Sequence, residues 1–287
     1  MIMEKLKKHP FACCAMIFLI CAIARIIEYF IIRTDETILS ENFIHKVFGI
    51  VLLWFILKGY TWKWSDIGFT KAGMLRGIGV GVLLGSICFV VAYSIESLIM
   101  YSMNKDVHLA FYASGFSLTN DMQQQRGIVY ILLCILFNII NVWMEEGVFR
   151  GLFSKILEGI SFVRSILLIA FLFGVWHWVM PFRDYMEGNS SITNLLIMGI
   201  GYMILAGIMS VKWSLLYKLS GSLWIGLGDH LFNNVIVTNL LHVISNREAD
   251  TMQIVRIMIG QILSFTVVLI NYLKHRQKTK MNAAPGS

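Results

Sequence analysis

Three short groups of ionisable and polar residues in the second half of the chain could carry chemistry. In the first, Glu146 and Arg150 are four residues apart, with the acid nearer the N-terminus. On a helix this spacing predicts an ion pair on one face and turns Glu145 about 100° away. A carboxylate in an apolar cavity is a stronger base than one in water, so Glu145 is the candidate to activate a water molecule. Taken alone, the group could equally be an ion-pair cluster at a helix end.

The second and third groups each place two side chains four residues apart. Phe173 and His177 would share one helix face, where the imidazole could hold a water and pass its proton to a leaving amine. His230 and Asn234 offer two N–H donors that could hold the oxyanion of a tetrahedral intermediate. Taken alone, His177 could be a residue at the membrane–water interface. His230 and Asn234 could simply form hydrogen bonds between helices.

The conjunction of the three groups is more informative than any one of them. Each falls on a different long apolar stretch, and ionisable groups inside a membrane are costly enough to be functional candidates by default. An acid pair, a histidine, and a histidine with an asparagine are what a water-activating site inside a helical bundle needs.

The elements that must position these groups are transmembrane helices. Of the 287 residues 57% are hydrophobic and only 14% are charged, which excludes an ordinary water-soluble globular domain. Most of the apolar runs approach the ~20 residues that a helix needs to cross a bilayer. We predict an all-α polytopic bundle of about eight spans, forming a single integral membrane domain over residues 1–287. The spans are 11–32, 43–57, 77–101, 128–149 or beyond, 165–180, 192–211, 223–244 and 252–273.

The distribution of basic residues predicts the orientation. Lys and Arg are concentrated in the terminal segments and in alternate loops, with Lys212 counted among the loop residues. The positive-inside rule then predicts a multi-pass protein of the cell membrane with both termini cytoplasmic. Because these charges are spread over several short loops, we expect no nucleic-acid partner.

Two further patterns predict packing within and between helices. Gly73, Gly77, Gly81 and Gly85 recur every four residues, which predicts a stripe where a neighbouring helix approaches closely. Arg25 and Glu28 are three residues apart in the first span, which predicts an ion pair on one helix face.

The three motifs resemble those of the CPBP family of intramembrane proteases, the CAAX proteases and bacteriocin-processing enzymes also called Abi proteins. The pattern Glu-Glu-x-x-x-Arg ends at Arg150, Phe-x-x-x-His at His177 and His-x-x-x-Asn at Asn234, in the family's order. The resemblance covers residues 125–245, which we predict to be the catalytic core. Elsewhere it rests on hydropathy, span count and a Trp-x-x-Ile-Gly stretch at 64–68.

The resemblance implies peptide-bond hydrolysis within the membrane and a role for each motif residue. Glu145 and His177 would activate the water, and His230 and Asn234 would stabilise the oxyanion. Glu146, Arg150 and Phe173 would support the site. The family is often described as metalloproteases, so zinc on Glu145, His177 and His230 is an alternative. With no His-Glu-x-x-His helix in the sequence, we favour catalysis without a metal or other cofactor.

One feature of the predicted spans fits this site badly. His177 lies deep in its helix, whereas Glu145 lies close to the end of its own, although the two should be level. We therefore expect the fourth helix to continue past Arg150 toward Leu157, with local unwinding at Gly147 or Gly151.

The leading hypothesis is an endopeptidase that cuts a peptide or a lipidated, membrane-associated protein near its end. By resemblance, the substrates could be prenylated CAAX-type tails, bacteriocin or pheromone leader peptides, or a toxin in self-immunity. The lipid bilayer is the expected environment. The alternatives are a catalytically silent adaptor or self-immunity protein that binds a membrane protein partner, and a proton-coupled transporter, which the absence of an internal repeat disfavours.

Overall fold

The computed structural model describes residues 9–37, 39, 41–114 and 126–283. Its elements, in chain order, are α2 (Pro10–Ile27), η1 (Glu28–Ile32), η2 (Thr34–Glu36), α3 (Ile44–Tyr60), η3 (Trp64–Ile67), α4 (Met74–Ser102), β1 (Val107–Phe111), α5 (Ile128–Glu145), η4 (Glu146–Leu152), α6 (Phe153–Ile156), α7 (Phe162–Trp176), α8 (Val179–Met186), α9 (Ile192–Ser220), α10 (Trp224–Phe232), η5 (Asn233–Leu240), β2 (Leu241–Ser245), β3 (Glu248–Ala249) and α11 (Gln253–Ala283).

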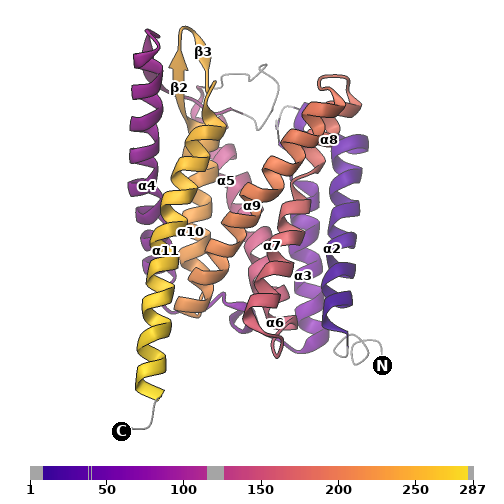
Figure 1. The fold of residues 1–287 in the computed structure, drawn as a ribbon. Coiled ribbons are helices and arrows are strands. Elements are labelled where there is room, and N and C mark those ends of the chain that lie inside the picture. The colour runs from indigo at the N-terminus through magenta and orange to yellow at the C-terminus, as the bar shows by residue number, and fades with distance from the viewer. Residues whose placement is uncertain (1–8, 38, 40, 115–125, 284–287) are drawn as a thin grey trace.

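The helices form one bundle, shown in Figure 1, which confirms the all-α polytopic fold. Six helices in the described part of the chain are long and apolar enough to cross a membrane. The other two predicted spans are also helical, as the shorter α3 and as α10 continued by η5. The start of α2 and the end of α11 lie at the same end of the bundle (Figure 1), as an even number of passes requires.

A small antiparallel sheet at one end of the bundle differs from the prediction. Its order is β1-β2-β3, with Val107 opposite Ser245 and Phe111 opposite Leu241. The helix predicted over 223–244 therefore ends at Leu240. A two-residue turn, Asn246 and Arg247, joins β2 to β3, with both φ angles positive as a tight hairpin requires.

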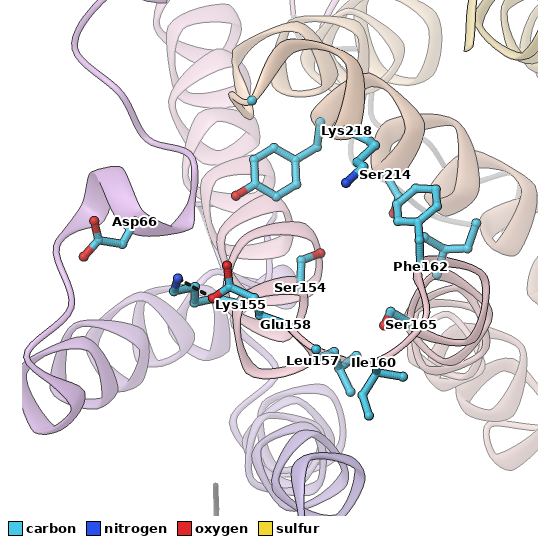
Figure 2. A pocket seen from close by; sticks show the side chains of 14 residues that line it. Asp66, Ser154, Lys155, Leu157, Glu158, Ile160, Phe162, Ser165, Ser214 and Lys218 are labelled. Atoms are coloured by element: carbon cyan, nitrogen blue, oxygen red, sulfur yellow. Dashed lines mark hydrogen bonds and ion pairs between the residues drawn. The ribbon is translucent and has the colours of Figure 1, made fainter. Parts of the chain in front are cut away.

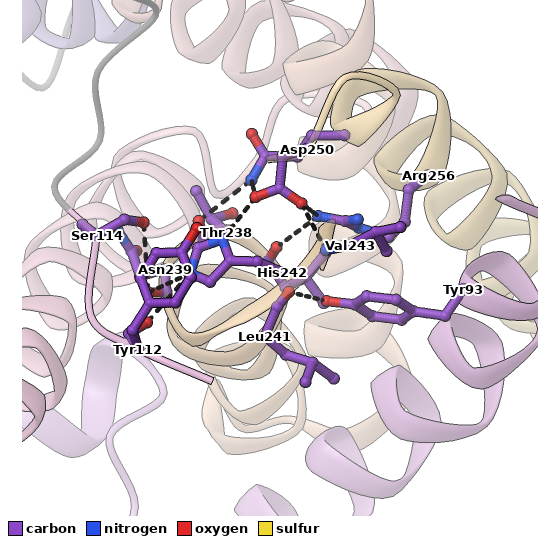
Figure 3. Close-up of polar contacts among 12 residues, drawn as sticks. Tyr93, Tyr112, Ser114, Thr238, Asn239, Leu241, His242, Val243, Asp250 and Arg256 are labelled. Atoms are coloured by element: carbon purple, nitrogen blue, oxygen red, sulfur yellow. Dashed lines mark hydrogen bonds and ion pairs between the residues drawn. The ribbon is translucent and has the colours of Figure 1, made fainter. Parts of the chain in front are cut away.

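Buried charges fasten this sheet to the bundle, as Figure 3 shows. His242 Nδ1 lies 2.6 Å from Asp250 Oδ2, and Arg256 Nη2 donates to Asp250 Oδ1 at 2.8 Å. Arg256 Nη1 donates to Glu96 Oε2 on α4 at 2.8 Å. Burial raises the pKa of Asp250, but the bonds and charges of His242 and Arg256 outweigh it, so this pKa lies below its usual value.

The predicted glycine stripe packs against α10, the helix that carries His230. A Cβ on Gly81 would lie 2.1 Å from Ile225 O, and one on Gly77 or Gly85 would meet Trp224 or Phe232 at 2.6 or 2.8 Å. The close approach is thus confirmed for three of the four glycines. Gly73 is the exception, because it precedes α4 with φ of 73° and has open space around its Cβ position.

The predicted pair of Arg25 and Glu28 is wrong, because each side chain has other partners. Glu28 accepts from the backbone N–H groups of Ile44 at 2.8 Å and His45 at 2.6 Å, so it caps the start of α3. Arg25 Nη1 donates to Trp176 O at 2.8 Å. The arginine therefore ties α2 to the end of α7, beside the motif residues.

Candidate active site

The fourth span continues past the acid pair, as expected. The chain stays helical from Ile128 to Ile156, and it widens into the π-helix η4 between Glu146 and Leu152. The local change falls on the two glycines singled out from the sequence. A Cβ on Gly147 would meet Leu53 at 2.8 Å, and one on Gly151 would meet Ile67 O at 2.7 Å. The segment thus carries Glu145 and Glu146 inside the bundle.

Glu146 and Arg150 form the predicted ion pair, fully buried. Arg150 Nε donates to Glu146 Oε2 at 2.8 Å, and Nη2 donates to Oε1. Arg150 has no exposed surface, and its guanidinium lies 4.2 Å from the centre of the Phe173 ring and 4.9 Å from that of Trp213. A bidentate pair between aromatic faces fixes the Glu146 carboxylate in its ionised form.

His230 lies between the two glutamates. Its Nδ1 is 2.8 Å from Glu146 Oε1, and its Nε2 is 3.6 Å from Glu145 Oε2. The Trp213 ring stacks on the imidazole, with centroids 3.9 Å apart and planes 15° from parallel. Because an ionised carboxylate only accepts, Nδ1 carries a proton and donates to Glu146. Nε2 is therefore the ring nitrogen that faces Glu145 and can take part in the site.

Glu145 has one oxygen held and one oriented toward His230. Trp176 Nε1 donates to Oε1 at 2.9 Å, and the side chain is nearly buried. The positive charge of Arg25 also acts on this carboxylate electrostatically. An acid so placed can take a proton from a water beside Oε2 without losing its own position.

His177 follows the last residue of α7 and is half-buried. Its Nδ1 lies 2.8 Å from Phe173 O, and because a carbonyl only accepts, Nδ1 donates and the neutral ring keeps its lone pair on Nε2. The Phe173 ring packs edge-on to the imidazole at 4.7 Å between centroids. Both contacts explain the four-residue spacing of this motif, and they leave Nε2 available as a base.

Asn234 lies at the junction of α10 and η5 and is half-buried. Its Oδ1 accepts from Asn233 Nδ2 at 3.1 Å. That bond uses the acceptor end of the Asn234 amide and leaves Nδ2 as the donor end. The four-residue spacing from His230 spans the change from α-helix to π-helix.

The sequence did not reveal the aromatic and charged residues that hold the motif side chains. Trp176 belongs to none of the three motifs, although it holds Glu145. Trp213 Nε1 donates to Asp229 Oδ2 at 2.8 Å, which fixes the ring stacked on His230. Asp229 in turn pairs with Lys212. Lys212 was counted as a loop residue, but α9 continues to Ser220 and the lysine has no exposed surface.

A cavity of about 400 Å³, shown in Figure 2, lies apart from these residues, at the end of the bundle away from the sheet. None of the predicted site residues lines it. Its four charged side chains balance, two of each sign, so the cavity shows no preference for an anion or a cation. They are Asp66, Lys155, Glu158 and Lys218.

Zinc held by Glu145, His177 and His230 is the alternative to catalysis without a metal. Among the described residues, no group of three His, Cys, Asp or Glu side chains is arranged to hold a metal ion. Glu145 and His230 face each other, and the bond of His177 Nδ1 to a backbone carbonyl leaves Nε2 as the nitrogen that a metal would use. Glu145, His177 and His230 are thus not such a group in this arrangement of the described residues.

Comparison with known families bears on the same stretch of chain. Residues 127–236 match the family model of Rce1-like proteins, described as type II CAAX prenyl endopeptidase Rce1-like. We call residues 127–236 the Rce1-like domain. The match agrees with the CPBP resemblance, and the Rce1-like domain contains all three motifs, from Glu145 to Asn234. No curated protein matches the chain.

Proposed function

We propose that the protein is an intramembrane endopeptidase of the CAAX type, which hydrolyses a peptide bond near the end of a membrane-associated protein or peptide. The Rce1-like domain and the apolar bundle support this class of activity. The observation that carries the proposal is the placement of Glu145, held by Trp176 through one oxygen and facing His230 with the other.

In the proposed first step, a water lies between Glu145 Oε2 and His177 Nε2. Glu145 takes a proton from the water, which His177 Nε2 helps to hold, as the water oxygen attacks the carbonyl carbon of the peptide bond. Trp176 keeps the carboxylate in place, and the Phe173 carbonyl keeps the imidazole tautomer. A general base so placed contributes a factor of about 10²–10⁴ to the rate.

In the second step, His230 and Asn234 hold the oxyanion of the tetrahedral intermediate. Because Glu146 accepts the Nδ1 proton, Nε2 of His230 donates only when the ring carries both protons. The charges of Glu145, Glu146, Arg150 and protonated His230 then sum to zero, which is how a buried site tolerates an imidazolium. Collapse of the intermediate breaks the C–N bond, and the amine leaves with the proton taken from the water.

We propose that this chemistry is of the glutamate type, without a metal. The role set of base, oxyanion donors and supporting ion pair is complete in the residues described above. If zinc were bound instead, Glu145, His177 and His230 would be its ligands, and the ion would supply the activated water.

The substrate and the orientation are part of the same proposal. The start of α2 and the end of α11 lie at one end of the bundle, and with the lysines and arginines near both termini of the sequence this favours cytoplasmic termini in the cell membrane. The substrates to test are prenylated C-terminal tails and leader peptides, and a role in bacteriocin processing or self-immunity would follow from cleavage of the second kind.

The test is a comparison of peptide termini in membranes of cells that express the wild type, Glu145→Ala or His177→Ala at matched levels. We expect new termini only with the wild type, and their sequences would identify the substrate. If all three membranes give the same termini while a cellular effect of the protein persists, the protein acts as an adaptor for a membrane protein partner.

A further inference from the structure

We propose that Lys212, Gln261 and Asn233 form a directed chain of hydrogen bonds that orients the Asn234 amide for catalysis. The three are positioning residues, and the assignment rests on the proposed role of Asn234 as an oxyanion donor. The chain is called the amide relay below. It begins on α9, crosses to α11 and ends at the junction of α10 and η5.

The head of the relay is a group that can only donate. Lys212 Nζ is fully buried, and its donors go to Asp229 Oδ2, to Gln261 Oε1 at 2.6 Å and to Ser264 Oγ at 3.0 Å. An ammonium has three N–H groups and no lone pair, so it always selects the oxygen of the Gln261 amide. The other end of that amide, Nε2, must then point away as a donor.

The direction set at Lys212 is passed on through two amides. Gln261 Nε2 donates to Asn233 Oδ1 at 3.0 Å, which leaves Asn233 Nδ2 as a donor. Asn233 Nδ2 then donates to Asn234 Oδ1 at 3.1 Å. Each amide has one acceptor end and one donor end, so every link fixes the next. At the end of the relay, Asn234 is left with Nδ2 as the group that can donate to an oxyanion.

The relay fixes which of its two orientations the Asn234 amide adopts. The two ends of this amide have nearly the same shape, and a flipped amide would present an oxygen to the developing negative charge. Stabilisation by preorganised donors depends on their being in place before the charge forms. A buried cation at the head of a hydrogen-bond chain also polarises the later links in the same sense.

The relay also extends the functional unit beyond the Rce1-like domain. Gln261 lies on α11, outside residues 127–236. It is buried, although an amide facing lipid or an apolar core would be costly without partners. A C-terminal helix that only completed the bundle would not need this residue at this place.

The test uses substitutions that keep shape and reverse the direction of donation. In Asn233→Asp neither side-chain oxygen donates to Asn234, so the Asn234 amide would turn to donate to Asp and present its oxygen to the site. Ser264→Ala removes another partner of Lys212 and is the matched control. Purified full-length variants in liposomes are compared for kcat and KM on a peptide that the wild type cleaves, and for their thermal unfolding midpoints.

For Asn233→Asp we expect kcat to fall about 10²-fold, as for Asn234→Ala, with KM nearly unchanged. The double variant Asn233→Asp/Asn234→Ala should be no slower than Asn234→Ala, and Ser264→Ala should stay near the wild type. The relay is overturned if Asn233→Asp keeps kcat within about twofold of the wild type while Asn234→Ala loses it, or if the two losses multiply.

A second readout does not depend on activity. The midpoint shifts of Gln261→Leu and Asn233→Ala should be less than additive in the double variant, because both remove the same bond. If the wild type cleaves no peptide yet this coupling is present, the proposed function fails and the chain of bonds stands. If the shifts add, the relay itself is refuted.

Discussion

Removal of Arg150 should destabilise the folded protein. The main cause should be the buried charge left without a partner, and not the loss of packing volume. Arg150→Met keeps much of the aliphatic volume and the contact with Phe173 and Trp213, but it leaves the Glu146 carboxylate buried without its bidentate partner. Both side chains are at most 1% exposed, so water cannot replace the arginine.

The magnitude follows from this burial. Breaking a buried ion pair by removing one partner costs ~3–5 kcal/mol, whereas replacing both partners costs much less. In Glu146→Gln/Arg150→Met the glutamine can still accept from His230 Nδ1, so only a neutral bond is weakened. We expect the double variant to lose ~1–2 kcal/mol. The second substitution should therefore restore about half or more of the stability lost in the first.

The assay is equilibrium unfolding of the purified protein in mixed micelles, followed by tryptophan fluorescence, because Trp213 and Trp176 lie beside the pair and its neighbours. The Lys155→Met variant is the control, since Lys155 pairs with Glu158, which is 70% exposed, and such pairs contribute little. The reasoning is refuted if Arg150→Met and the double variant are equally destabilised, or if the single loss is below about 1 kcal/mol.

Three further predictions concern packing, pH and metal. Gly81→Ala should cost about 1–3 kcal/mol, because its Cβ would overlap Ile225 O, whereas Gly79→Ala should be neutral; equal unfolding midpoints would contradict this. Asp250 has a lowered pKa, so its stabilisation is present above about pH 4 and is lost as the pH falls through the folded value. Asp250→Asn should thus be ~2 kcal/mol less stable than the wild type at pH 7, and this difference in the free energy of unfolding should disappear in acid. A difference that stays constant with pH would contradict the prediction. Dialysis against a chelator should leave peptide hydrolysis unchanged; loss that zinc restores would show a zinc site.

Spacing along the chain predicted those parts of the site that lie on one helix. The Glu146–Arg150 pair, the contact of Phe173 with His177 and the continuation of the fourth helix all follow from helical geometry and depth. The partners across helices did not follow. Trp176 reaches Glu145 from 31 residues away, and nothing in either local sequence specifies that contact.

Hydropathy also concealed two features that depend on tertiary structure. Lys212 lies next to an apolar run and was taken to end it, but its buried pairing with Asp229 lets α9 continue. Residues 241–244 read as the end of an apolar helix, yet β1 offers an edge to pair with, and the turn at Asn246 and Arg247 favours a hairpin. The asparagine before a charged residue was the available signal for that turn.

The most direct test of the central claim is hydrolysis of a farnesylated peptide and of a leader-type peptide by the full-length protein in liposomes, measured for the wild type and for Glu145→Gln. The variant keeps the acceptor for Trp176 Nε1 and removes the base. The account predicts cleavage of at least one peptide by the wild type, a rate ~10²–10⁴-fold lower for Glu145→Gln, and equal unfolding midpoints. Cleavage by both proteins at similar rates would contradict the assignment of Glu145 as the residue that activates water.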